Sequence, residues 1–193
     1  MTWGIPRGAV IAVLLASAAP LPAAIQERPD AEDRALLGQA IAGAESFRDR
    51  FEAEVWLTDM TARLNRWDSL PAEERIEILK IVHLEATRAG LAPELVLSVI
   101  HVESNFDRFA ISSAGARGLM QVMPFWLEEL DRPDADLFDI HTNIRFGCTI
   151  LKHYLDREKG DNSRALARYN GSLGQQWYPQ RVFDALHKRW YLQ

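Results

Sequence analysis

A chain of 193 residues is long enough for one medium-sized globular domain with a short extension, and it is too short for two full domains. Apolar residues make up 48% of it and charged residues 25%, which is the balance of an ordinary folded protein. The net charge of -5 argues against partners held mainly through phosphate groups, because such binding depends on clustered lysine and arginine. We therefore expect no nucleic-acid partner.

The first 24 residues have the composition of an export signal. Arg7 supplies a positive charge, residues 9–19 form an apolar stretch, and small residues lead up to Ala24. The apolar stretch is shorter than the roughly 20 residues that span a bilayer. We predict a signal peptide over residues 1–24 and an exported chain. An uncleaved anchor is the alternative, because the residue three positions before the expected cut is not small.

Residues 25–69 are predicted to form a helical extension. Asp30 can cap a helix with acidic residues in its first turn, where they favour the positive end of the helix dipole. Apolar residues then recur at spacings of three and four, which predicts one long amphipathic helix; they are Leu37, Ala40, Ala44, Phe47, Phe51 and Val55. Packing of this helix within the chain is the simpler interpretation, and docking of an envelope protein partner is the other.

Residues 70–193 are predicted to form a compact, mainly α domain with a loop-built groove. No alternating pattern long enough for a major sheet occurs. A helix over residues 93–104 is apolar nearly all round, so it should be the central buried helix. The other predicted helices open at Ser69 and Pro71, at Pro124, at Ile140, at Ser163 and at Pro179, with glycine stops at Gly90 and Gly160 and a loop or strand-like lip over 111–118.

Glu103 is the candidate catalytic group. It follows Val99 by one turn near the end of the apolar helix, so its carboxyl should emerge from the core with reduced hydration. Lost hydration disfavours the charged form and raises the pKa above its reference of about 4.3. A carboxyl of this kind can donate a proton near neutral pH. The alternative from position alone is a surface glutamate that closes a helix.

Three ordered motifs surround and follow this residue. They read Glu-Ser-Asn-Phe over 103–106, Ser-Ser-Ala-Gly-Ala-Arg-Gly-Leu-Met-Gln-Val-Met-Pro over 112–124, and Ala-Leu-Ala-Arg-Tyr-Asn-Gly over 165–171, with matching Asn143, Ile144, Gly147 and Leu151 between them. Together they resemble the signature of the soluble lytic transglycosylase family, which shares the goose-type lysozyme fold. The resemblance covers roughly residues 70–186 and implies a lysozyme-like helical domain. One departure is Gly171-Ser172, where the family more often has Ala-Gly.

The resemblance implies a role for individual residues. Glu103 would be the catalytic acid/base, and the substrate groove would hold Ser112, Gln121, Met123, Tyr169 and Asn170. A hydroxyl at Ser112 or Tyr169 can hydrogen-bond the carboxyl in either protonation state, since a hydroxyl both donates and accepts. The amides of Gln121 and Asn170 suit the N-acetyl groups of amino sugars.

The reaction implied is cleavage of peptidoglycan between N-acetylmuramic acid and N-acetylglucosamine without water, to give 1,6-anhydromuramyl ends, in the periplasm or cell envelope of a bacterium. One alternative is a goose-type lysozyme-like hydrolase, in which Asp107 or an acidic residue of 128–131 steers a water. Another is a non-catalytic peptidoglycan-binding scaffold. The sequence alone gives no indication of oligomeric state.

Metal and cofactor sites are not expected. The five histidines lack a paired metal spacing, and the glycines at 115 and 118 lack the spacing of a dinucleotide motif. His101 points away from the Glu103 face of its helix and is interpreted as structural. Met120 and the lone Cys148 are interpreted as core residues, because both side chains pack readily in apolar interiors.

Overall fold

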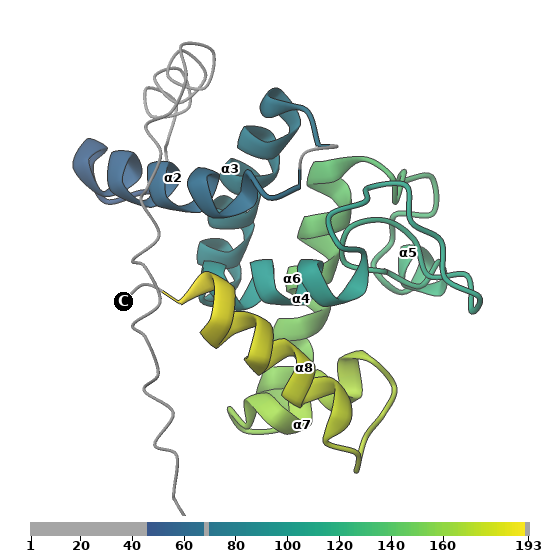
Figure 1. Cartoon of the computed structure of the whole chain (residues 1–193). Coiled ribbons are helices and arrows are strands. Elements are labelled where there is room, and N and C mark those ends of the chain that lie inside the picture. The colour runs from purple at the N-terminus through teal and green to yellow at the C-terminus, as the bar shows by residue number, and fades with distance from the viewer. Residues whose placement is uncertain (1–45, 68–69, 192–193) are drawn as a thin grey trace, which may run out of the picture.

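The computed structural model describes residues 46–67 and 70–191, and these fold into a helical domain (Figure 1). Within these residues the extended pairings are two isolated bridges, Ile111 with Arg117 and Arg117 with Val122. The prediction of a mainly α fold is confirmed. The helices are α2 (Arg50–Leu64), α3 (Ala72–Ala89), α4 (Pro93–Glu103), α5 (Phe125–Glu129), α6 (Ile140–Arg157), α7 (Asn162–Tyr169), α8 (Trp177–Ala185) and the π-helix η1 (Leu186–Trp190).

Helix α4 lies at the centre of the domain, as predicted. Every residue from Leu95 to Ile100 is buried, so the helix contacts protein on all sides. It packs against α3, α8 and η1, while α3 also packs against α2 and α6 (Figure 1). Because α4 is held all round, the position of its last residue, Glu103, is fixed by the core.

Two predicted helix stops are confirmed. Gly90 follows α3 with a left-handed φ of 67°, and the backbone N–H groups of Gly90 and Leu91 donate to the carbonyls of Thr87 and Ala86. This pattern satisfies carbonyls that the helix leaves open, and a glycine adopts it without steric cost. Gly160 ends the turn after α6 in the same way, with a φ of 87°. The turn at Gly90 sends the chain directly into α4.

Two predicted helix starts need correction. Asp161, and not Ser163, caps α7: its carboxylate accepts from the backbone N–H of Arg164 at 3.0 Å, and Ser163 lies inside the helix. Both residue types can cap a helix, so the pattern alone did not separate them. Helix α8 begins at Trp177, two residues before Pro179. A proline fits there because the first N–H groups of a helix have no partner within it.

The long N-terminal helix is interrupted in the part that the structure describes. Residues 46–49 form a turn and bends, and the extended Asp49 accepts from the N–H of Glu52 at 2.8 Å to start α2. The new start changes which face is buried. Phe51 and Val55 of the predicted stripe are 75% and 49% exposed, and the buried side holds Ala53, Trp56, Leu57, Met60 and Leu64.

Helix α2 and the residues before it belong to the same core. The ring of Phe47 stacks on His83 with 3.5 Å between ring centroids, and the Ser46 hydroxyl and His83 Nδ1 lie 2.8 Å apart. Burial lowers the pKa of His83 to about 4. Packing within the chain thus accounts for residues 46–64, whereas the start at Asp30 and the signal peptide over 1–24 fall outside the described residues.

Across residues 46–67 and 70–191, none of the helices combines the length and apolar character needed to cross a bilayer.

Candidate active site

Glu103 is the last residue of α4 and is half-buried, as the sequence predicted. Burial raises the pKa of its carboxyl to about 7, against an ordinary value of 4.5. The cause is lost hydration at the end of an apolar helix. A carboxyl with this pKa holds its proton in a large share of molecules at neutral pH, so it can serve as a general acid and, once ionised, as a general base.

Tyr178 is the hydrogen-bond partner of this carboxyl. Its hydroxyl, on α8, donates to Glu103 Oε1 at 2.5 Å. The same hydrogen bond and the positive charge of Arg181, three residues further along α8, both lower the pKa of Glu103, but burial outweighs them. Neither Tyr178 nor Arg181 was predicted from the sequence as part of the site. Their spacing of three places them on one helix face, but no local pattern linked that face to a residue 75 positions earlier.

The two hydroxyls expected to hold the carboxyl lie elsewhere. Tyr169 donates to the backbone carbonyl of Met120 at 2.7 Å. The Ser112 hydroxyl accepts from the backbone N–H of Ala116 at 3.1 Å, which closes a tight turn in the loop. Tyr169 is still a neighbour of the acid, because the charge of Glu103 contributes to the raised pKa of Tyr169. In this structure, therefore, Tyr178 alone of these hydroxyls holds the carboxyl.

The turn that follows Glu103 has an unusual backbone. Asn105 and Phe106 both have positive φ values, 51° and 66°, which bulky residues rarely adopt. Such conformations cost on the order of 1 to 3 kcal/mol each and persist where packing enforces them. Phe106 is 2% exposed, with its ring against Trp67 and Trp190. This anchor reverses the chain immediately after the acid and fixes the direction of the loop.

Gln121 has a structural role in the loop of residues 112–124, which carries the second sequence motif and is called the groove loop. It has a positive φ of 50°, and its Nε2 donates to the carbonyls of Ala110 and Gly118 at 3.1 and 2.9 Å. Met123 and Asn170 are both half-buried at the surface. The binding roles of Ser112, Gln121, Met123, Tyr169 and Asn170 toward a sugar remain predictions.

Asn143 clamps this loop to α6. Its Oδ1 accepts from the N–H of Met120 at 2.7 Å, and its Nδ2 donates to the carbonyls of Arg117 and Leu137. The backbone of Gly118 passes so close to Asn143 that a Cβ at position 118 would lie 2.3 Å from Asn143 Nδ2. Gly118 also has a positive φ of 74°, so a glycine is needed there on both grounds. From the sequence, Asn143 was predicted only as a match to the family's motif. A polar residue beside the apolar Ile144 was the signal that could have singled it out.

Of the residues interpreted as structural, Met120 and Cys148 lie in the core and His101 is half-buried. Met120 and Cys148 are fully buried, and burial raises the pKa of the Cys148 thiol. His101 stands edge-on to Trp67, with 5.1 Å between ring centroids, and burial lowers its pKa. The described residues contain no group of three His, Cys, Asp or Glu side chains arranged to hold a metal ion.

Several proteins are similar to this chain. The transglycosylase of Enterobacteria phage PRD1 is 39% identical over 105 residues, which cover 51% of this chain and 38% of that protein. Membrane-bound lytic murein transglycosylase F of Desulfosudis oleivorans is 35% identical over 100 residues, or 49% of this chain and 22% of that protein. Membrane-bound lytic murein transglycosylase C of Haemophilus influenzae is 33% identical over 122 residues, or 55% of this chain and 33% of that protein. The chain thus spans well under half the length of these relatives.

Among solved structures, an inactive mutant of the lytic transglycosylase Slt from Pseudomonas aeruginosa is 22% identical, with a TM-score of 0.47, and the match covers 82% of this chain and 32% of that one. The model of the transglycosylase SLT domain matches residues 81–189, which is more than half of the chain and contains Glu103, the groove loop, Tyr169 and Tyr178. The chain therefore belongs to the transglycosylase SLT domain family.

Proposed function

We propose that this protein is a lytic transglycosylase that cleaves peptidoglycan, with Glu103 as its acid/base. The observation that supports this most is the carboxyl itself. It is half-buried at the end of a buried helix, its pKa is raised to about 7, and a single hydroxyl holds it at 2.5 Å. The relatives named as lytic murein transglycosylases make peptidoglycan the substrate to test first.

The proposed reaction cleaves the bond between N-acetylmuramic acid and N-acetylglucosamine. Protonated Glu103 donates its proton to the bridging oxygen as the bond to the muramyl carbon breaks, and the N-acetyl group of the muramyl sugar steadies that carbon. The ionised carboxylate then takes the proton from the muramyl 6-hydroxyl, which attacks the same carbon. The product is a 1,6-anhydromuramyl end, and the attack within one sugar gives the rate advantage of an intramolecular step.

The surroundings of Glu103 favour this route over hydrolysis with a second carboxylate. The charged side chain that acts on the pKa of Glu103 is Arg181, and among the described residues no acidic group does so. Asp107, one of the residues expected to steer a water, accepts from the N–H of Phe109 at 2.9 Å and holds its own turn. The usual hydrolytic route needs two carboxyl groups that flank the glycosidic bond to be cleaved. One acid group suits an attack by the sugar's own hydroxyl.

Export to the periplasm or cell envelope is part of this proposal. The relatives named as membrane-bound lytic murein transglycosylases support an envelope location. The signal peptide over residues 1–24 and an envelope partner bound through the N-terminal helix stay predictions from the sequence.

Digestion of purified cell walls tests the proposal. Mass analysis of the fragments should find products one water lighter than those of hydrolysis, and reducing ends would instead indicate a hydrolase. The matched variant is Glu103→Gln, which keeps the size and a hydrogen-bond acceptor for Tyr178. Equal clearing by both proteins would remove Glu103 from the mechanism, and no clearing by either would favour a binding scaffold.

A further inference from the structure

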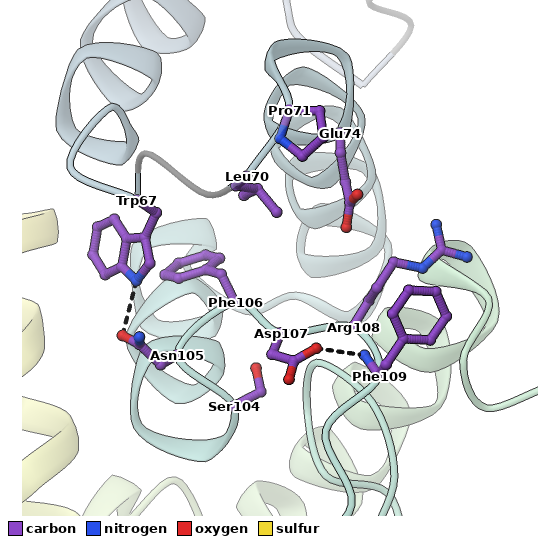
Figure 2. Close-up of a pocket in the computed structure, with 10 residues that line it drawn as sticks. All are labelled: Trp67, Leu70, Pro71, Glu74, Ser104, Asn105, Phe106, Asp107, Arg108 and Phe109. Atoms are coloured by element: carbon purple, nitrogen blue, oxygen red, sulfur yellow. Dashed lines mark hydrogen bonds between the residues drawn. The ribbon is translucent and has the colours of Figure 1, made fainter.

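A cavity of about 500 Å³ opens beside the turn that follows Glu103 (Figure 2). It begins at Ser104, the next residue in the chain, and Glu103 is not part of its lining. It lies between the end of the N-terminal extension, the start of α3 and the loop after α4. Its lining residues are Trp67, Leu70, Pro71, Glu74, Ser104, Asn105, Phe106, Asp107, Arg108 and Phe109.

Two carboxylates line this cavity, Glu74 of α3 and Asp107 of the loop after α4. Figure 2 shows Glu74 hanging from α3 toward the loop that carries Asp107. Neither residue forms a salt bridge with any residue that the structure describes, although Asp107 accepts from the N–H of Phe109. Burial raises the pKa of Glu74, Arg108 lowers it, and the negative charges of Glu77 and Asp107 raise it. A bound cation would offset the negative charges that act on Glu74.

The positive charge that acts on Glu74 is that of Arg108, which packs on a neighbouring aromatic ring. The guanidinium of Arg108 lies over the ring of Phe109, 4.8 Å from its centroid, and in Figure 2 it extends away from Asp107. Its Nε is buried and makes no hydrogen bond. Arg108 therefore moderates the negative charge of the cavity without filling the space between Glu74 and Asp107.

Aromatic side chains form the walls. Trp67 and Phe106 meet at 4.8 Å between ring centroids, and Phe109 is 63% exposed at the other side. The indole N–H of Trp67 donates to Asn105 Oδ1 at 2.8 Å, which leaves the amide N–H₂ of Asn105 as a donor. Aromatic faces attract both alkyl groups and cations. The cavity thus combines apolar walls with two acceptor carboxylates.

We propose that this cavity binds the amine-bearing side chain of a wall peptide, with its ammonium group between Glu74 and Asp107 and its alkyl stem against Trp67 and Phe106. The proposal rests on the proposed function, because peptidoglycan would supply such a peptide on the same strand that Glu103 cleaves. The ammonium would add a positive charge between the two carboxylates, in the space that Arg108 does not fill. A peptide anchored here would hold its sugar strand beside the end of α4.

Binding of two matched peptides to the full chain tests this assignment. The first probe is the tripeptide alanyl-γ-glutamyl-lysine, and the second has norleucine in place of lysine, which removes only the amine. We expect the lysine peptide to shift the indole N–H resonance of Trp67 and to bind about tenfold more tightly, as for a hydrogen-bonded charge. Equal affinity for both peptides, or no shift at Trp67, would overturn the proposal.

Variants that neutralise single carboxylates test whether peptide binding depends on the acids that line the cavity or on surface charge in general. Glu74→Gln and Asp107→Asn should each weaken the lysine peptide by about tenfold and leave the norleucine peptide unchanged. Asp107→Asn keeps a side-chain oxygen for the N–H of Phe109, so the turn is preserved. The control is Glu77→Gln, one turn away on α3 and outside the lining, which should change the affinity less than about twofold. An equal effect of all three variants would contradict the assignment.

The test is independent of glycan cleavage, because the probes contain no sugar. Wall clearing that is lost in Glu103→Gln, together with equal affinity for the two peptides, would overturn the peptide site alone. Clearing retained in Glu103→Gln, together with selective binding of the lysine peptide, would overturn the catalytic role of Glu103 and leave the site standing.

Discussion

Two glutamates in neighbouring helices, Glu85 on α3 and Glu103 on α4, have lost much of their contact with water and behave in opposite ways. Glu85 is 1% exposed, and Glu103 is half-buried. The pKa of Glu85 is nevertheless lowered, whereas that of Glu103 is raised to about 7. Depth of burial therefore does not decide which of the two can hold a proton.

The difference comes from their partners. Burial raises the pKa of Glu85, but hydrogen bonds from Arg88 at 2.5 Å and His141 at 2.8 Å, with Arg145 at 3.9 Å, outweigh it. Glu103 has one neutral hydroxyl and the charge of Arg181. Cations stabilise the charged form of a buried acid, and a lone hydroxyl does so far less. The fold thus contains one glutamate that joins α3 to α6 and one that is free to exchange a proton.

Cleavage activity should separate the two residues most strongly. Glu103→Gln is expected to lower the rate of wall cleavage by about 10² to 10⁴-fold, because it removes the general acid. Glu85→Gln makes the same change, from a carboxylate to an amide of equal size. It should retain most of the activity in protein that is still folded. Release of soluble fragments from purified walls measures both. Comparable losses of activity in the two variants would contradict a catalytic role that is specific to Glu103.

Stability should show the reverse order. Glu85→Gln is expected to lower the free energy of unfolding by about 2 kcal/mol at pH 7, because it leaves Arg88 and His141 without their shared carboxylate. The figure is below that of a fully buried pair, since the side chains of the two partners are 40% and 47% exposed. Urea unfolding followed by tryptophan fluorescence gives the value. An unchanged urea midpoint would show that the contacts of Glu85 with Arg88 and His141 contribute little to stability.

Glu103 should make stability depend on pH in a defined direction. The folded chain holds this proton up to a pKa of about 7, whereas the unfolded chain releases it near 4.5. The stability linked to the proton is therefore complete below about pH 4.5 and is lost as the pH rises through 7. At pH 8 Glu103→Gln should be more stable than the wild type by about 3 kcal/mol, and at pH 4 the two should agree. Urea unfolding at both pH values tests this, and a constant difference would contradict it.

Removing the Tyr178 hydroxyl should have the smallest effect, a shift in the pH profile of cleavage. Its hydroxyl favours the ionised form of Glu103, so Tyr178→Phe is expected to raise the pKa of Glu103 further. The alkaline limb of the kcat/KM profile for wall cleavage should move up by less than about one pH unit. The control is Tyr191→Phe, at a tyrosine 58% exposed, which should leave the limb in place. A downward shift in Tyr178→Phe would reverse the assigned role of the hydroxyl.

The sequence was a good guide wherever a local pattern carried the information. The apolar run from Leu95 to Ile100 predicted the buried helix, and the position of Glu103 at its end predicted both its half-burial and the direction of its pKa. Gly90 was predicted as a helix stop because a glycine followed by an apolar residue, here Leu91, is a common way for a helix to end, and the left-handed φ of Gly90 confirms it. These features depend on residues within one or two helical turns.

Features set by distant contacts were not predicted. The partner of Glu103 is Tyr178 on α8, whereas the sequence pointed to Ser112 or Tyr169, since all three are hydroxyls and only the packing of α8 on α4 selects one. The break before α2 was missed because Phe47 and Phe51 keep a helical spacing on either side of Asp49. In both cases tertiary contacts chose between options that the local sequence left equivalent.

The central claim is that Glu103 keeps its proton near neutral pH without a cationic partner at hydrogen-bonding distance. Carbon-13 NMR of glutamate-labelled protein, with the Glu103 carboxyl assigned by comparison with Glu103→Gln, measures this directly. We predict a titration midpoint of about 7 for Glu103 and one below the ordinary value for Glu85. A midpoint for Glu103 near the ordinary value of 4.5 would contradict the account.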